Sequence, residues 1–192
     1  KALEETLPEG TKVRTVYDQS TFIDAAIGEV KSAALIGGLL AILVLYAFLR
    51  DARATLISGI AIPVSVLGTF VLMYAFDVTL NIMSLGGIAL AVGMLVDNAV
   101  VVLESIVRKQ EHGMERSEAA RRGTAEVAMA VTAATLTSVA VFFPMVFITG
   151  VAGQLFRDQS LTVTFALAFS LVVALTLVPM LAAGRTERVA DA

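Results

Sequence analysis

Long apolar stretches separated by short charged segments dominate the chain. A bilayer core about 30 Å thick is crossed by about 20 apolar residues of α-helix. Five stretches of 18 to 25 residues meet or approach this length: residues 32–49, 55–76, 82–103, 127–149 and 160–184. The pattern predicts an all-α polytopic membrane protein with five transmembrane helices, in which residues 21–184 form a transmembrane bundle.

The two ends of the chain differ from this bundle. Residues 1–20 are polar, and apolar and polar positions alternate over residues 12–17, as in a β-strand. Because a lone strand is not stable, we interpret residues 1–20 as the tail end of a larger external domain with a short N-terminal strand. We expect residues 185–192 to begin a cytoplasmic segment, and the whole chain to be a fragment of a longer protein.

Composition supports the membrane interpretation and excludes several functions. Apolar residues make up 57% and charged residues 16%, and the mean hydropathy is +0.84, whereas soluble domains have about 45–50% and about 25%. The absence of cysteine excludes disulfides and thiolate metal sites. A net charge of −3 gives no basic surface for nucleic acid. Without a phosphate-binding glycine loop, a nucleophile–base pair or a metal-ligand cluster, we expect no enzyme, cofactor or metal.

The basic residues predict the orientation. Nine lysines and arginines lie in residues 50–54, in residues 104–126 and after residue 184. One lies in the alternate connections, residues 77–81 and 150–159. The positive-inside rule places the nine on the cytoplasmic side. The N-terminal end is then external and the C-terminal end cytoplasmic.

Asp97 is the only charged residue inside the five stretches. It lies about 22 Å along its helix from Ile82, within the hydrocarbon, where an aspartate costs about 2.5–3.5 kcal/mol. A helix–helix hydrogen bond or chance exposure to a hydrated crevice would explain it structurally. The functional interpretation is a proton relay, because a carboxyl that moves between apolar surroundings and a cation binds and releases a proton.

Other residues near Asp97 extend this candidate site. Asn98 lies about 100° round the helix and can exchange hydrogen bonds without titrating, which makes it a secondary member. Glu104 lies two turns further on the same face and is either a proton exit or a solvated acid. Small residues let helices pack closely around a polar group, and three precede Asp97: Gly86, Gly87 and Gly93.

The sequence does not determine the partners of the remaining polar residues. Four hydroxyls in the fourth stretch either bond between helices or line a water path: Thr132, Thr135, Thr137 and Ser138. No stretch contains Lys, Arg or His, so a charge partner of Asp97 has to lie on a helix outside the five. In the connection before the fourth stretch, residues 116–126 are predicted to be helical, after a break at Gly113 and with Ser117 as the N-cap.

Several segments resemble efflux permeases of the resistance-nodulation-division (RND) superfamily. The sequence GGIALAVGMLVDNAVVVLE of residues 86–104 resembles their fourth transmembrane helix. Residues 143–147, 153–157 and 175–181 resemble their fifth and sixth helices, and residues 48–55 the turn between the second and third. The likeness covers nearly the whole chain and is closest to the hydrophobe/amphiphile, acriflavine-resistance-type branch.

This resemblance implies a location, an activity and partners. The chain corresponds to the end of the first periplasmic porter domain and to helices two to six of twelve, half of the RND bundle. The expected protein is a homotrimeric transporter of the bacterial inner membrane that exports compounds by proton antiport. It joins a periplasmic adaptor and an outer-membrane channel.

The resemblance also bears on the relay. Drug exporters of this branch carry two adjacent aspartates on the fourth helix, which act with a lysine on the tenth. Asp97 matches the first, whereas Asn98 stands in place of the second. Alternatives are an RND-fold machine for protein or lipid export, a heavy-metal exporter and a non-transporting scaffold; a channel is least favoured, because one acid makes a poor selectivity filter.

Overall fold

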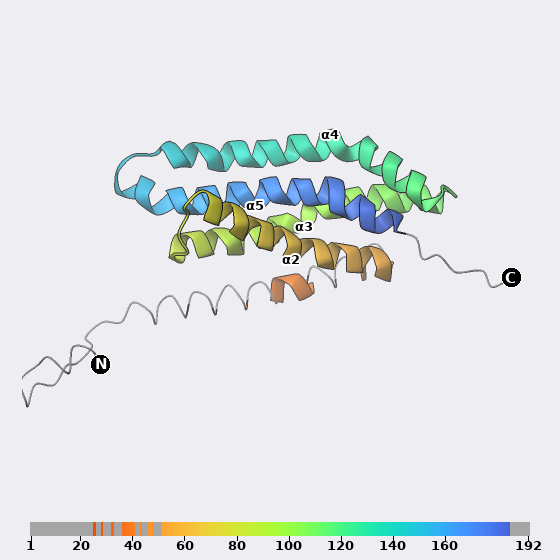
Figure 1. The fold of residues 1–192 in the computed structure, drawn as a ribbon, viewed down its shortest axis with the longest axis horizontal. Helices are drawn as coiled ribbons and strands as arrows, with labels where there is room; N and C mark the ends of the chain where they lie inside the picture. The colour runs from red at the N-terminus through yellow and green to blue at the C-terminus, as the bar shows by residue number, and fades with distance from the viewer. Residues whose placement is uncertain are drawn as a thin grey trace, which may run out of the picture.

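The computed structural model describes residues 51–184 without a gap; before them it describes only residues 25, 28, 32, 36–40, 43, 46 and 47, all helical. Residues 51–184 form α2 (Ala52–Ala75), α3 (Ile82–Glu111), α4 (Arg116–Phe142), the 3-10 helix η1 (Phe143–Phe147) and α5 (Gly150–Ala183). Figure 1 shows the four long helices lying side by side and alternating in direction.

All four α-helices, with η1 counted as an extension of α4, are long and apolar enough to cross a membrane. The prediction of an all-helical membrane fold is therefore confirmed for the described residues, which contain no strand. The fifth helix, expected over residues 32–49, is described only in part. The strand expected over residues 12–17 lies outside the described residues, so both stay predictions.

Polar side chains fix the starts of α2 and α3. The Asp51 carboxylate accepts hydrogen bonds from the backbone N–H groups two and three residues later, at 2.7 and 3.3 Å. At the start of α3, Asn81 caps the helix and Ser84 bonds back to the Asn81 N–H at 2.8 Å, a reciprocal capping box. Between these helices Asp77 adopts a left-handed φ of 53°, a conformation that aspartate tolerates better than most residues. The α2–α3 connection is thus short and well defined.

The α3–α4 connection corrects one prediction. Gly113 has a φ of +83° and ends α3 as expected. The next helix begins at Arg116 with Glu115 as its N-cap residue, and no side chain caps it. Ser117 therefore lies inside the first turn of α4, and its prediction as the N-cap was wrong. The connection already ends at Glu115, so the backbone at Ser117 is helical and cannot serve as the cap.

Helices α3 and α5 lie at the centre of the bundle. They contact each other and both contact α2 and α4, whereas among the described residues α2 and α4 do not contact each other. Close approach depends on glycines: a Cβ atom at Gly87 of α3 would lie 2.9 Å from the Gln159 carbonyl oxygen of α5. The resulting core includes Val102 and Ile106 of α3 and Val178 of α5, all fully buried.

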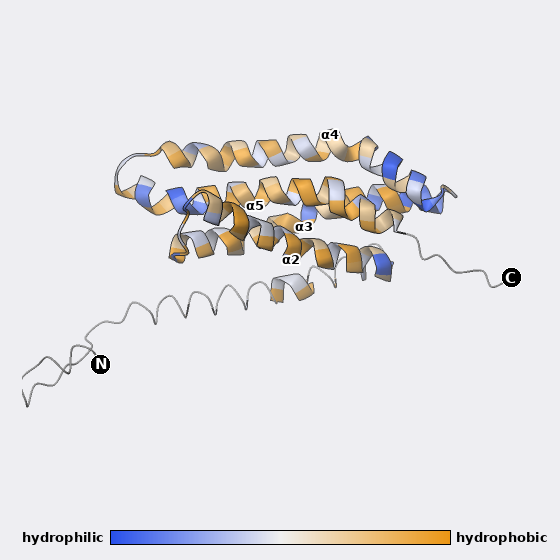
Figure 2. Cartoon of the chain, in the orientation of Figure 1, coloured by the Kyte–Doolittle hydropathy of each residue, from blue (hydrophilic) through white to orange (hydrophobic). Residues whose placement is uncertain are grey.

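The outside of the bundle is also apolar. Figure 2 shows hydrophobic residues along the length of the helices and hydrophilic ones gathered towards the helix ends. Tyr74 is 89% exposed and Met129 is 84% exposed. Extended apolar surfaces of this kind mark contact with membrane or protein, as expected for helices that face lipid.

Candidate functional site

All exposed residues of α3 lie on one face of the helix. Their spacing of three or four residues aligns them in a single stripe. We call this set the α3 stripe: Ile82, Gly86, Leu90, Gly93, Asp97, Val101, Glu104, Arg108 and Glu111. Asp97 lies near the middle of the stripe, and the residues that precede it there are apolar or glycine. The carboxylate is therefore presented on an open face and not enclosed by α2, α4 or α5.

Asp97 lacks a partner in the part of the chain that the structure describes. The ion pairs there join Arg108 and Lys109 to Glu126, and Arg121 and Arg122 to Glu118. All of these groups lie outside the apolar stretches of the helices, and no hydrogen bond between described residues reaches the Asp97 carboxylate.

Asn98 faces the buried side of α3, about 100° round the helix from Asp97. Its side chain is 9% exposed, and its Oδ1 accepts a hydrogen bond from Thr135 Oγ1 of α4 at 3.2 Å. Ser170 of α5 donates a hydrogen bond to the Leu95 carbonyl oxygen at 3.0 Å. Two neighbouring helices thus bind α3 within two residues of Asp97, on the side that carries Asn98.

The other predicted site residues divide between two faces. Gly86 and Gly93 lie on the α3 stripe, where an added Cβ atom would meet nothing within 4 Å. Gly87 lies on the buried side and lets α5 approach closely. Glu104 is exposed on the stripe, two turns beyond Asp97. The structure therefore brings Gly86, Gly93 and Glu104, but neither Gly87 nor Asn98, to the face of Asp97.

Sequence reasoning missed Ser170 and did not select Thr135. Of the four hydroxyls named in the fourth stretch, Thr137 and Ser138 donate to backbone carbonyls of their own helix, and Thr135 alone is buried. The available signal for Ser170 was one of five hydroxyls in the apolar run of residues 160–184, which does not reveal the neighbour it contacts.

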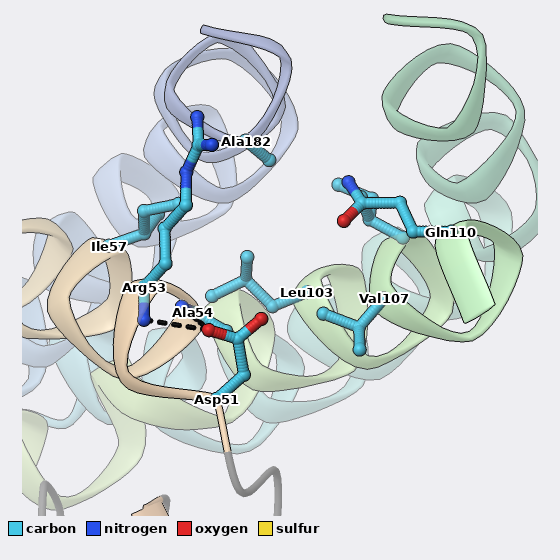
Figure 3. A pocket seen from close by; sticks show the side chains of 9 residues that line it. Asp51, Arg53, Ala54, Ile57, Leu103, Val107, Gln110 and Ala182 are labelled. Carbon is cyan, nitrogen blue, oxygen red and sulfur yellow. Dashed lines mark hydrogen bonds between the residues drawn. The ribbon is translucent and has the colours of Figure 1, made fainter. Parts of the chain in front are cut away.

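A second group of polar contacts joins the start of α2 to the end of α5. Arg53 Nη2 donates hydrogen bonds to the carbonyl oxygens of Leu181, at 3.4 Å, and of Gly184. Figure 3 shows the small adjoining pocket, in which the Asp51 carboxylate lies towards Leu103 and Val107 and the Arg53 side chain runs towards Ala182. Because Arg53 binds backbone groups at the end of α5, it fastens α2 to α5.

The asparagine cap of α3 also connects to α5. Asn81 Nδ2 donates a hydrogen bond to the Asp158 carboxylate, and Thr162 Oγ1 donates to the Asp158 carbonyl oxygen at 2.7 Å. This contact lies at the opposite end of α3 from the Arg108, Lys109 and Glu126 ion pairs. The α3–α5 pair is thus fixed by polar groups at the end where α3 begins.

The fold and the site together define a polytopic helical membrane protein with one carboxylate, that of Asp97, within its apolar stretches. A profile of the AcrB/AcrD/AcrF family matches residues 1–186. The chain belongs to this family, which confirms its resemblance to RND permeases.

Individual relatives give the same assignment. The chain is 42% identical to the multidrug resistance protein MdtC of Shigella flexneri over 179 residues, which cover 93% of this chain and 18% of that protein. It is 43% identical to MdtC of Photorhabdus laumondii over 182 residues, or 95% of this chain and 18% of that protein. The chain therefore spans about a fifth of the length of these relatives.

Proposed function

We propose that the chain provides helices two to six of a permease that exports amphiphilic compounds in exchange for protons, with Asp97 as the residue that binds and releases the proton. The observation that carries this proposal is the position of Asp97, the one charged residue of the apolar segments, on the open α3 stripe. Intramembrane acids of this kind are costly and mark ion or proton pathways.

A proton relay needs surroundings that change. On the α3 stripe, the Asp97 carboxyl is neutral when apolar surfaces surround it and is ionised when a cation comes close. The cations among residues 51–184 lie outside the apolar stretches, so the cation comes from another part of the protein, as the lysine on the tenth helix does in RND drug exporters. Movement of that part relative to α3 would load and release the proton.

The charge distribution supports an orientation. The end of the bundle with the α3–α4 connection carries Arg108, Lys109, Arg121 and Arg122, and by the positive-inside rule this end is cytoplasmic. The α2–α3 connection is then periplasmic. Family membership supports a homotrimer in the bacterial inner membrane, with a periplasmic adaptor and an outer-membrane channel. The name of the MdtC relatives supports drugs as the exported compounds.

The test is Asp97→Asn in the full-length permease, expressed in bacteria that lack their other drug exporters. We expect efflux of a fluorescent amphiphilic dye to be lost while the amount of protein in the membrane is unchanged. Asp77→Asn is the matched control, because it makes the same chemical change at an exposed turn residue whose left-handed conformation asparagine also tolerates. Normal efflux by the Asp97→Asn permease would overturn the proposal.

A further inference from the structure

Two buried hydroxyls bind α3 beside Asp97, one from each neighbouring helix. Thr135 of α4 is 4% exposed and bonds the side chain one residue after Asp97, while Ser170 of α5 is 2% exposed and bonds the backbone carbonyl two residues before it. Both bonds cross between helices. By contrast, the exposed hydroxyls of Thr137 and Ser138 bond their own helix.

The contacts on that side determine how α3 is rotated about its axis. Successive residues of a helix are separated by about 100°, so a rotation of that size would bring Asn98 to the stripe and carry Asp97 away from it. Packing on the buried side of α3 opposes such a rotation, but next to Asp97 that side carries only small and medium side chains such as Ala91, Leu95 and Ala99. A hydrogen bond, by contrast, is directional.

We infer that Thr135 and Ser170 are positioning residues of the proton relay, which act through Asn98 and the Leu95 carbonyl to keep Asp97 on the α3 stripe. This inference rests on the proposed function of Asp97. It also gives Asn98 a defined role, because the Asn98 Oδ1 accepts the hydrogen bond that connects α3 to α4. Because α4 and α5 bind α3 on the same side, a displacement of either helix would be transmitted to the Asp97 carboxyl.

The size of the expected effect follows from the strength of such bonds. Hydrogen bonds between transmembrane helices contribute on average a factor of about three to an equilibrium. The loss of one bond therefore leaves the bundle folded, but it changes the fraction of permeases in which Asp97 is correctly placed. We expect a partial defect in proton coupling and not a loss of protein.

The experiment compares single variants of the full-length permease in proteoliposomes, with dye transport measured over a range of pH. Thr135→Val removes the hydroxyl and keeps the shape; we expect a rate about threefold lower and a displaced pH profile at equal protein amounts. Thr135→Ser keeps the hydroxyl and restores both. Thr137→Val is the matched control on the same helix and retains wild-type transport. Ser170→Ala is expected to resemble Thr135→Val.

The pH profile is interpretable because few groups titrate near Asp97. The other ionisable residues of the α3 stripe are Glu104, Arg108 and Glu111, and the apolar stretches of α2, α4 and α5, residues 55–75, 127–142 and 160–183, contain no charged residue. The charged residues of α4 and α5 lie nearer the ends of these helices: Arg116, Glu118, Arg121, Arg122, Glu126, Arg157 and Asp158. A second measurement tests the connection itself. If Thr135 acts through Asn98, the Asn98→Ala/Thr135→Val double variant is no slower than Asn98→Ala alone.

The outcomes separate the two proposals. Normal transport by Asp97→Asn would overturn the proposed function and the positioning role with it. An inactive Asp97→Asn together with a wild-type rate and pH profile for Thr135→Val would overturn the positioning role alone. Additive losses in the double variant would also overturn it, because they would show that Thr135 acts independently of Asn98.

Discussion

Gly123 of α4 lies directly against Ile106 of α3. A Cβ atom at Gly123 would come within 2.9 Å of both the backbone nitrogen and the Cα atom of Ile106. The same approach allows Ser105 Oγ to donate a hydrogen bond to the Gly123 carbonyl oxygen at 3.0 Å. The backbones of α3 and α4 are therefore in close contact near the end of the pair that carries the charged residues.

Gly123→Ala is expected to destabilise the permease. Alanine raises helix propensity by about 1 kcal/mol, but the new methyl group would push the two backbones apart, and overpacking costs about 1–3 kcal/mol. We expect a lower thermal unfolding temperature in detergent. Ile106→Ala should not rescue it, because the nearest atoms belong to the Ile106 backbone. A higher unfolding temperature for Gly123→Ala would contradict the close approach.

Gly68→Ala should behave differently, because its neighbour is a side chain. A Cβ atom at Gly68 of α2 would lie 2.1 Å from the Phe169 ring of α5. We expect a loss of stability of about 1–3 kcal/mol that largely disappears when the same change is made in a Phe169→Leu background. Thermal unfolding of the wild type, the two single variants and the double variant measures the coupling between Gly68 and Phe169. If Gly68→Ala lowers the stability equally with and without the Phe169→Leu change, a clash with the Phe169 ring is not the cause.

Asn98→Ala is expected to reduce transport without abolishing it. The change leaves the buried Thr135 hydroxyl without its acceptor and removes one of the two contacts that orient α3 beside Asp97. Dye efflux normalised to the amount of protein in the membrane is the measurement. Wild-type efflux would show that Asn98 is a packing residue with no part in the relay.

Arg53→Gln should loosen the end of α5. The guanidinium reaches carbonyl oxygens of the last turn and the C-cap, and hydrogen bonds from a charged group contribute about 1.5–3 kcal/mol. We expect backbone amides near Met180 and Gly184 to exchange roughly tenfold faster with deuterium, as the lower end of that range implies. Arg53→Lys tests the geometry, because lysine lacks the planar fork. An unchanged rate of amide exchange in Arg53→Gln would show that the Arg53 hydrogen bonds do not stabilise the last turn of α5.

The pKa of Glu118 provides a pH test outside the apolar part of α4, which begins at Val127. Hydrogen bonds from Arg121 and Arg122 lower the pKa of the Glu118 carboxyl from 4.5 to about 2. Because the folded-state pKa is the lower one, the stabilisation is fully present above pH 4.5 and is lost as the pH falls toward 2. Carboxyl chemical shifts in NMR should give a midpoint near 2, rising towards 4.5 in the Arg121→Gln/Arg122→Gln variant. A midpoint near 4.5 in the wild type would refute the pairing.

Much of the fold could be predicted from the sequence. The absence of charge located the four long helices, and Gly113 marked the end of α3, because only glycine readily adopts its φ of +83°. The start of α4 at Arg116 agrees with the predicted helix over residues 116–126, but its N-cap residue is Glu115 and not Ser117. A local signal cannot show how many residues a connection uses.

Less of the candidate site could be predicted. Asp97 was identifiable because a charge in an apolar helix is rare, and helix periodicity correctly separated its direction from that of Asn98. Periodicity gives the angle of a side chain around its own helix but not the identity of the helix that it meets. Thr135 was therefore indistinguishable from Thr137 in sequence, and Ser170 gave no signal of its contact with Leu95.

The hydrogen bonds from Arg53 to the carbonyl oxygens of Leu181 and Gly184 have a mechanical consequence. They fasten the first turn of α2 to the C-terminal end of α5, so the chain enters and leaves the four-helix segment at one corner. A body attached at one corner pivots about that corner when the rest of the molecule moves. The α2–α3 and α4–α5 connections, at the opposite end of the bundle in Figure 1, would then sweep the widest arc.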